Sequence, residues 1–391
     1  MLISPLPPIR CTCESQDRLH DSRCNSLSKI IEKLNFCNTL LVVHPAVSAL
    51  DNIWSNMPTP DVLVTGAAGH LGYALMLTLP SLGYTPLGID ILPCGASSLV
   101  GSIEDRTFIT KIFTDHPTIK HVVHTATLHK PHIDSHTKED FIKTNITGTL
   151  ILLEEAANLG QQIESFVFIS TTSAFGSALS PKRGEPAAWI DESVVPKPKN
   201  IYGVTKVAAE NMCYLIHRQT QLPVIVLRTS RFFPEQDDDE DRRNSMGDEN
   251  LKLCELLYRR VDIADVVKSC VCAMKKGLGL GWGLYIISAT SPLPRTSETL
   301  RNLDSNPSSV IKTVSPGSIK EFSKRGFRYP DRIDRVYDSS KAVRELGWEP
   351  DYTFEKSIER LSQGAQWQSS LTAHVGMRGY HTVSTGVYTI K

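Results

Sequence analysis

From about residue 61 onward, the pattern of apolar and polar positions shows two kinds of segment, which alternate along the chain. Short apolar runs with the length and composition of buried strands occupy residues 62–65, 87–91, 121–124, 165–170 and 224–227. Longer segments with the helical spacing of apolar positions lie between them, at residues 71–82, 105–115, 141–159 and 202–220. Strands that alternate with helices predict an α/β fold, a Rossmann-type doubly wound parallel sheet with right-handed crossovers.

A glycine-rich turn joins the first predicted strand to the first predicted helix. Residues 62–72 read Val-Leu-Val-Thr-Gly-Ala-Ala-Gly-His-Leu-Gly, with glycines at Gly66, Gly69 and Gly72. This spacing permits a tight turn, close approach of a pyrophosphate to the backbone, and packing of helix against strand. Asp90 follows at the end of the second predicted strand, where a carboxylate accepts both ribose hydroxyls of NAD and repels a 2′-phosphate. A glycine-rich turn alone occurs in many α/β proteins, but turn, strand, helix and acid together predict dinucleotide binding.

The composition is that of an ordinary globular protein. The 391 residues are 41% hydrophobic and 21% charged, with 42 basic and 42 acidic side chains. A zero net charge gives no electrostatic reason to expect nucleic acid or an anionic membrane as a partner. No apolar run reaches the roughly 18 residues of a membrane span, and the N-terminal segment lacks the apolar core of a signal peptide. The nine cysteines follow no disulfide or zinc spacing. We therefore expect a cytoplasmic enzyme without a metal site.

A hydroxyl cluster and a tyrosine–lysine pair carry the candidate chemistry. Tyr202 and Lys206 are four residues apart at the start of a predicted helix, so they share one helix face. The ammonium group lowers the cost of ionising the phenol, which can take a proton from a substrate alcohol while hydride leaves the same carbon. Such a pair alone is common on helix surfaces. Thr171 stands where the strand predicted at 165–170 ends, and its hydroxyl can bind the substrate oxygen beside Tyr202.

Together these motifs resemble those of one enzyme family. The matching pieces, in the family's order, are residues 65–72, Asp90, 124–127, 145–149, 170–176, 202–206, 262–266 and 346–350. The chain is similar over residues 61–361 to the extended short-chain dehydrogenases/reductases of the NAD-dependent epimerase/dehydratase family, the group that includes UDP-glucose 4-epimerase. The resemblance implies NAD as the cofactor and a smaller C-terminal substrate-binding region beside the Rossmann-type sheet.

The resemblance also assigns roles to particular residues. Thr171 corresponds to the catalytic serine or threonine, Tyr202 to the base, and Lys206 to the lysine that supports the tyrosine and binds the nicotinamide ribose. The implied cofactor-binding positions are Gly66, Ala68, Gly69, His70, Leu71, Gly72, Asp90, Ser102, Ile103, Thr125 and Ala126, together with Tyr202 and Lys206. Asn145 corresponds to a position that packs a helix.

Departures from the family pattern bear on the substrate. Members that dehydrate sugars carry Asp-Glu after the catalytic threonine, whereas this chain has Thr172 and Ser173, which argues against a dehydratase. Ser102 replaces an aspartate, so one adenine contact differs. Arg231 stands where nucleotide-sugar epimerases have an asparagine, and Glu255 stands where they have an arginine. Because arginine binds phosphate or carboxylate as a bidentate fork, we expect an anionic substrate contacted by Thr172, Ser173 and Arg231.

The same residues are compatible with two enzymatic outcomes. An epimerase returns hydride to the opposite face of a rotated ketone, whereas a dehydrogenase releases the ketone and NADH. A nucleotide-sugar 4-epimerase is one hypothesis, and an NAD-dependent dehydrogenase or reductase of another polar or anionic alcohol is the alternative. A third hypothesis is a non-catalytic NAD-binding regulator. It is disfavoured, because such a protein has no physical need for Thr171, Tyr202 and Lys206 together.

The pattern also divides the chain into segments. We expect an N-terminal extension outside the fold at 1–57, an NAD-binding Rossmann domain with the catalytic residues at 58–230, a mainly substrate-binding region at 231–363, and a loosely held tail at 364–391. The polar stretch 235–248 is predicted to be an exposed loop. The expected partner is a small-molecule substrate such as a sugar nucleotide, and a homodimer is left open.

Overall fold

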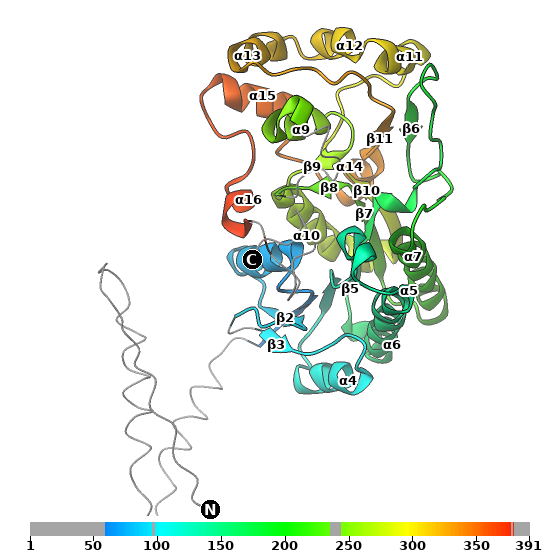
Figure 1. Cartoon of the computed structure of the whole chain (residues 1–391). Helices are drawn as coiled ribbons and strands as arrows, with labels where there is room; N and C mark the ends of the chain where they lie inside the picture. The colour runs from blue at the N-terminus through cyan, green and yellow to red at the C-terminus, as the bar shows by residue number, and fades with distance from the viewer. Residues whose placement is uncertain (1–58, 96–97, 235–243, 377, 379–391) are drawn as a thin grey trace, which may run out of the picture. The chain divides into compact units, whose positions relative to one another are not determined.

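The computed structural model describes residues 59–95, 98–234, 244–376 and 378, which belong to one unit of the chain (Figure 1). The predicted N-terminal extension 1–57 and half of the predicted tail, residues 377 and 379–391, therefore lie outside the described residues.

A parallel sheet of seven strands forms the centre of this unit, with the order β10-β7-β5-β4-β1-β2-β3 (Figure 1). Its strands are β1 (Val62–Thr65), β2 (Pro86–Asp90), β3 (Ser98–Val100), β4 (His121–His124), β5 (Ser165–Thr171), β7 (Val224–Thr229) and β10 (Trp282–Ile287). All neighbouring strands run parallel. This parallel pairing confirms the Rossmann-type sheet that the alternating pattern predicted. The pattern was informative because parallel strands that are covered on both faces are continuous apolar runs.

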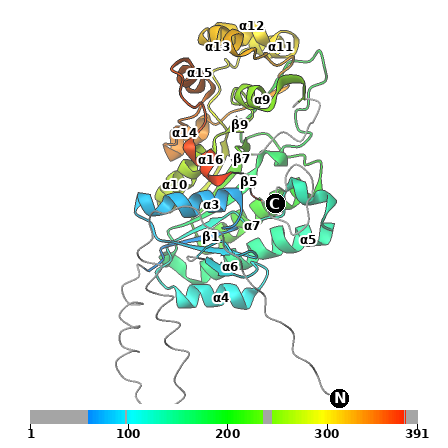
Figure 2. The same ribbon diagram turned by 60° about the vertical axis from the view of Figure 1, so that its left-hand side comes forward.

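Helices cover both faces of the sheet, and alternate residues of β1 point to the two sides. Val62 and Val64 pack with α3 (His70–Thr78), α10 (Ile263–Leu280), α14 (Ser340–Leu346) and α16 (Ser370–Val375). Leu63 packs with the opposite layer, which consists of α4 (Arg106–Asp115), α6 (Thr149–Asn158) and α7 (Ile201–Thr220). Figure 2 shows α3 on one side of β1, with α6 and α4 on the other.

One predicted helix is divided in the structure. The apolar pattern predicts a continuous helix over residues 141–159, but the chain forms α5 (Lys138–Ile142), a π-helical turn at Lys143–Gly148, and then α6. Asn145 lies in this turn. A π turn changes the hydrogen-bond step without changing which residues are apolar, so the pattern could not reveal it.

The C-terminal half builds a second apolar cluster beyond the sheet. Its helices are α9 (Asp248–Glu255), α11 (Ser297–Ser305), α12 (Pro307–Val314), α13 (Gly317–Arg325) and α15 (Phe354–Ser362). Two small parallel sheets link it to the rest: β6 (Ala188–Ile190) pairs with β11 (Arg335–Tyr337), and β8 (Arg231–Phe232) pairs with β9 (Arg260–Val261). Residues 235–243 of the predicted polar loop lie outside the described residues, and residue 248 already begins α9.

Residues 367–375 of the predicted tail are packed rather than loose. Trp367 and Ser369 are buried, and Val375 of α16 joins the core that contains α3 and α10. The expectation of a loosely held tail is therefore wrong for residues 367–375. These positions are buried by segments distant in the sequence, such as α3 and α10, which a local pattern does not reveal. None of the described helices is long and apolar enough to span a membrane.

Candidate functional site

A cavity of about 470 Å³ opens at the carboxyl ends of the central strands, where doubly wound sheets bind their ligands. Most of the residues predicted from the sequence line it: Gly66, Ala68, Gly69, His70, Leu71, Asp90, Ser102, Ile103, Thr125, Ala126, Thr171, Thr172, Ser173, Tyr202 and Arg231. Gly72 and Lys206 are not among the residues that line the cavity, because both are buried in the helices α3 and α7 next to residues that do. The structure thus brings the predicted positions together in one place.

The glycine-rich turn has the backbone that a pyrophosphate requires. Gly66 has a φ of +71°, and a Cβ there would lie 2.7 Å from the Ala126 nitrogen. A Cβ on Gly72 would lie 2.0 Å from the carbonyl oxygen of Gly66, so helix and turn can pack closely only with glycine. Gly69 is the N-cap of α3, and no side chain of the described residues caps it. The first N–H groups of α3 therefore suit a bound anion, and the turn fits a dinucleotide.

Asp90 is fixed beside this turn by two backbone donors. The N–H groups of Ala68 and Leu92 donate to its two carboxylate oxygens, each at 2.9 Å. The carboxylate lines the cavity together with Ser102 and Ile103, which follow β3. Each oxygen retains a lone pair, so the carboxylate can still accept hydroxyl hydrogen bonds from a ribose.

His124 holds the ends of β1 and β4 together beneath the cavity. Its Nδ1 lies 2.7 Å from the Thr65 hydroxyl, and its Nε2 lies 2.9 Å from the Thr149 hydroxyl. Burial, and then the nearby Lys206, lower the pKa of His124 well below its usual value, so the ring is neutral. The Thr65 hydroxyl oxygen also accepts from the N–H groups of Thr125 and Ala126 at 3.2 and 3.1 Å. This network sets the path of the two cavity-lining residues.

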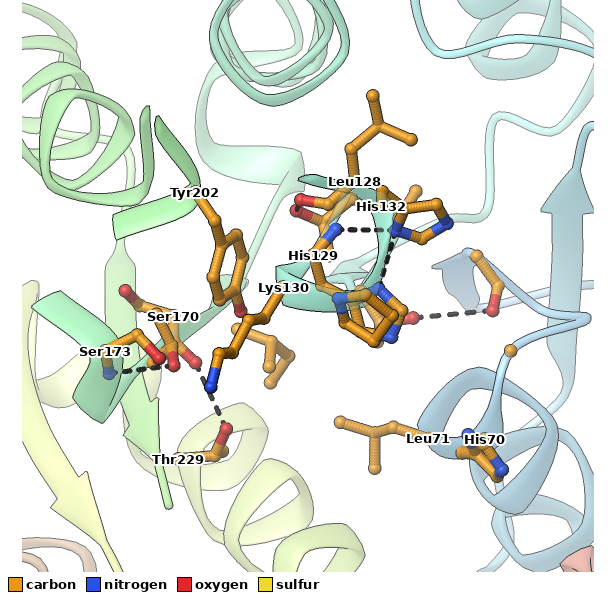
Figure 3. A pocket seen from close by; sticks show the side chains of 18 of the residues that line it. His70, Leu71, Leu128, His129, Lys130, His132, Ser170, Ser173, Tyr202 and Thr229 are labelled. Atoms are coloured by element: carbon orange, nitrogen blue, oxygen red, sulfur yellow. Dashed lines mark hydrogen bonds between the residues drawn. The ribbon is translucent and has the colours of Figure 1, made fainter. Parts of the chain in front are cut away.

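Thr171 and Tyr202 reach the cavity from two adjoining elements. Thr171 ends β5, and its Oγ1 accepts the Ser173 N–H at 3.0 Å, which leaves its own proton available for a substrate oxygen. Tyr202 lies in the first turn of α7, which Asn200 caps by accepting the Gly203 N–H at 3.0 Å. Figure 3 shows the Tyr202 ring in the cavity, on the side opposite His70 and Leu71 of the glycine-rich turn.

A buried ion pair ties the strand of Thr171 to the helix of Tyr202. Glu210 of α7 accepts from the Ser170 hydroxyl at 2.5 Å and from two nitrogens of Arg228 on β7 at 2.9 and 2.6 Å. Glu210 and Arg228 are each only 4% exposed. Because these contacts join β5, β7 and α7, they limit relative movement of the two groups that would handle the substrate oxygen.

Lys206 lies under Tyr202, one turn further along α7, and is only 2% exposed. Its Nζ lies 4.0 Å from the centroid of the Phe168 ring, a distance typical of a cation–π contact. Burial lowers the pKa of Lys206 to about 7. Its charge is therefore sensitive to an added anion or cation in the cavity above it.

The sequence prediction missed the loop after β4. Leu128, His129, Lys130 and His132 line the cavity, and Figure 3 shows Lys130 extending toward the side where Ser170 and Ser173 lie. Asn145 holds this loop: its Oδ1 accepts from the Leu128 N–H at 2.8 Å, and its Nδ2 donates to the Leu128 carbonyl at 2.8 Å. The signal was available, because these residues directly follow a strand end that faces the site.

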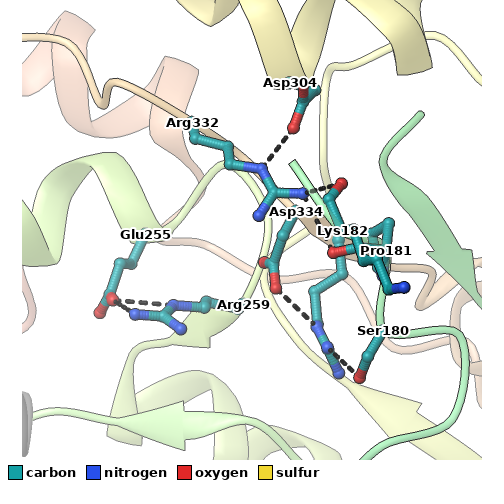
Figure 4. A network of polar contacts seen from close by, with 9 residues as sticks. Ser180, Pro181, Lys182, Glu255, Arg259, Asp304, Arg332 and Asp334 are labelled. Atoms are coloured by element: carbon teal, nitrogen blue, oxygen red, sulfur yellow. Dashed lines mark hydrogen bonds and ion pairs between the residues drawn. The ribbon is translucent and has the colours of Figure 1, made fainter. Parts of the chain in front are cut away.

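Arginines gather at the end of the cavity nearest the C-terminal region. Arg231, Arg259 and Arg335 line it, and Glu255 is the acid among them. Glu255 is 1% exposed and accepts from Arg259 at 2.8 Å and from the buried Arg260 at 2.7 Å. Figure 4 shows the Glu255–Arg259 pair and, nearby, Arg332 between Asp304 and the 181–182 backbone. Arg259 was noted from the sequence only as lying close to Glu255, whereas Arg335 was not predicted, since only the fold brings it to the cavity.

Comparison with known proteins gives a consistent result. The NAD dependent epimerase/dehydratase family model matches residues 62–278, more than half of the chain. A mouse dTDP-D-glucose 4,6-dehydratase is 25% identical over 332 residues, which cover 76% of this chain and 86% of that protein. A UDP-glucose 4-epimerase of Rhizobium meliloti is 26% identical over 323 residues, which cover 76% and 94%.

A solved structure shares the fold. The UDP-glucose 4-epimerase of Thermotoga maritima, solved with UDP-glucose, superposes with a TM-score of 0.52 at 24% identity and covers 78% of this chain and 99% of its own. The relatives include dehydratases as well as epimerases, so they do not support the sequence-based argument against a dehydratase. The family match, together with the glycine-rich turn and Asp90, establishes that the chain belongs to the NAD-dependent epimerase/dehydratase family, whose cofactor is NAD.

Proposed function

We propose that this protein transfers hydride at a secondary alcohol carbon of a sugar nucleotide and acts as an NAD-dependent epimerase. The observation that carries the proposal is the position of Thr171 and Tyr202, which line the same cavity as the glycine-rich turn and Asp90. NAD bound there would accept and return the hydride. Thr171 and Tyr202 would bind the alcohol oxygen, and the Tyr202 phenolate would take its proton.

The electrostatics of the site support Tyr202 as the base. Lys206 lies on the same face of α7 and places its ammonium group in a buried position, where a nearby charge acts more strongly than in water. A protonated Lys206 nearby would stabilise the phenolate form of Tyr202. Its own pKa is lowered to about 7 by burial, so formation of the phenolate would in turn favour the protonated amine.

The arginines of the cavity support an anionic substrate. Arg231, Arg259 and Arg335, together with Lys130, line this cavity, and their side chains are donors that an anion can accept from. A diphosphate would take bidentate hydrogen bonds from guanidinium groups and would be poorly bound by the remaining hydroxyl side chains alone. The nucleotide sugars named for the relatives carry such a diphosphate, and we assign this class of substrate here.

The side chains that follow Thr171 argue against a dehydratase activity. Elimination of water needs an acid and a base near the sugar, and Thr172 and Ser173 supply only hydroxyl groups. The alternative of a plain dehydrogenase is favoured by two departures, Arg231 and Glu255, at positions where epimerases of the family hold the sugar nucleotide. It would act on another anionic alcohol with the same Thr171 and Tyr202.

One experiment separates these reactions. Purified protein is heat-denatured and the supernatant is assayed for NAD, and native protein is incubated with UDP-glucose or UDP-galactose without added cofactor. The products are followed by NMR. Near-stoichiometric NAD and interconversion of the two sugars are expected, because an epimerase keeps its cofactor through both half-reactions. Accumulation of NADH on adding NAD indicates a dehydrogenase, and a product that has lost water indicates a dehydratase. If NAD binds but neither sugar nucleotide does, the substrate assignment is wrong.

A further inference from the structure

The segment that follows α15 reaches back to the cofactor-binding turn. The Arg378 Nε donates to the carbonyl oxygen of Ala68 at 2.9 Å, and the Arg378 backbone N–H donates to His70 Nε2 at 3.0 Å. The Arg378 guanidinium carbon also lies 3.6 Å from the centroid of the Tyr73 ring. Ala68 and His70 are residues of the glycine-rich turn itself, and both line the cavity.

These contacts place Ala68 between two charged side chains. Its N–H donates to the Asp90 carboxylate and its carbonyl accepts from Arg378, so both of its peptide groups are held. His70 is buried and is uncharged near neutral pH, because burial and the nearby Arg378 lower its pKa to about 4. A neutral imidazole nitrogen can accept the Arg378 N–H. The turn that would receive the pyrophosphate is thus connected to both Asp90 and the C-terminal segment.

The other end of the segment is also anchored. Asp262, the N-cap of α10, accepts from the Ser369 N–H at 2.9 Å and from the Ser369 hydroxyl at 2.5 Å. Val375 of α16 then packs into the core beside α3 and α10. Residues 369–376 are therefore held against α10 and α3. The position of Arg378 follows from this packing, as well as from its own contacts.

We propose that Arg378 is a positioning residue of the NAD site and that residues 369–376 and Arg378 form a C-terminal strap over the dinucleotide-binding turn. Two effects favour the bound pyrophosphate. The strap holds the Ala68–His70 backbone in place, which reduces the ordering that binding must impose. The guanidinium also adds a positive charge at the N-terminal end of α3, where an anion is already favoured. The proposal depends on NAD binding and not on the reaction assigned above.

The affinity for NAD tests the role of Arg378. NAD dissociation constants are measured by calorimetry for the unaltered full-length protein, Arg378→Met and Arg360→Met. Arg360 is the matched control, because it too donates to a backbone carbonyl, that of Asp351 at 2.8 Å, and lies 4.1 Å from the Tyr352 ring, but these partners are outside the glycine-rich turn. We expect Arg378→Met to weaken NAD binding about tenfold, within the usual range of coupling between linked groups, and Arg360→Met to leave it unchanged. The difference in NAD dissociation constant between Arg378→Met and the unaltered protein should be smaller at high salt, because screening weakens a charge effect.

Hydrogen exchange supplies a second measurement. Since coupling is reciprocal, NAD should slow amide exchange in residues 370–376 of the unaltered protein, and this protection should diminish in Arg378→Met. A purely structural role would lower thermal stability without changing the NAD dissociation constant, and that result would overturn the proposal. Equal effects of both variants would also overturn it. Absence of NAD binding by the unaltered protein would instead contradict the proposed function as well.

Discussion

The backbone N–H of Ala68 donates to the Asp90 carboxylate at 2.9 Å, so the residue expected to hold the adenine ribose also contacts the phosphate-binding turn. A carboxylate at this position repels a 2′-phosphate, and we expect NAD to bind more tightly than NADP. Asp90→Ser should narrow the difference between the two dissociation constants. Asp115→Ser, which removes an exposed carboxylate at the end of α4, should leave it unchanged. Tighter binding of NADP by the unaltered protein would contradict the assignment.

Removal of the Tyr202 hydroxyl should affect turnover and not cofactor binding. Tyr202→Phe keeps the ring but removes the group that exchanges a proton with the substrate, so kcat should fall by about 10²- to 10⁴-fold. The NAD dissociation constant, measured by calorimetry, should change little. Tyr214→Phe is the control on the same helix, because its side chain is exposed and lies outside the cavity. Activity close to that of the unaltered protein would mean that the proton is taken by another group.

Burial of Lys206 predicts a pH dependence of stability. Its pKa is lowered from 10.5 to about 7 on folding, so between these values the unfolded chain binds more protons than the folded protein. The free energy of unfolding should therefore rise as the pH increases from 7 toward 10.5, by up to about 1.4 kcal/mol per pH unit from this group. In the other direction, the protein should become less stable as the pH falls through this window to 7. Urea denaturation of the unaltered protein and Lys206→Met at pH 7, 8 and 9 measures it. A stability difference that does not change with pH would show that Lys206 titrates normally.

Breaking the Glu210–Arg228 pair should be costly because both partners are buried. Glu210→Ala leaves the Arg228 guanidinium without its counter-ion, and loss of one partner of such a pair costs about 3–5 kcal/mol. Chemical denaturation gives the free energy of unfolding. Glu139→Ala, which removes an exposed partner of Lys143 on α5, should alter stability little because water screens that pair. Similar losses in the two variants would mean that the buried pair has no special role.

Much of the fold could be predicted because buried parallel strands are continuous apolar runs. The bounds of β1 and β4 agree with the sequence pattern, and β5 and β7 are only slightly longer than predicted. The pattern missed β3, since its three residues are largely exposed at the sheet edge and carry no such run. It also missed the packing of α16, whose buried residues contact helices from distant parts of the chain.

The residues of the candidate site likewise fall into those that a local sequence pattern reveals and those that it does not. Gly66, Asp90, Thr171 and Tyr202 could be predicted because each stands at a fixed place relative to a strand end or helix start. Arg335 could not, because it reaches the cavity only through the pairing of β11 with β6. Positions defined by local geometry can be read from one sequence, whereas positions defined by long-range packing need the structure.

The pairing of β10 with β7 limits how this protein can be divided. The last strand of the sheet comes from residues 282–287, well after α7, and it pairs with β7 along six residues from Trp282 to Ile287. A fragment ending at residue 230 would expose the backbone donors and acceptors of β7, together with an apolar surface that α10 normally covers. Such an uncovered edge recruits strands from other molecules. We expect the isolated N-terminal half to aggregate, so the cofactor-binding and substrate-binding regions would have to be inherited, expressed and engineered as a single piece.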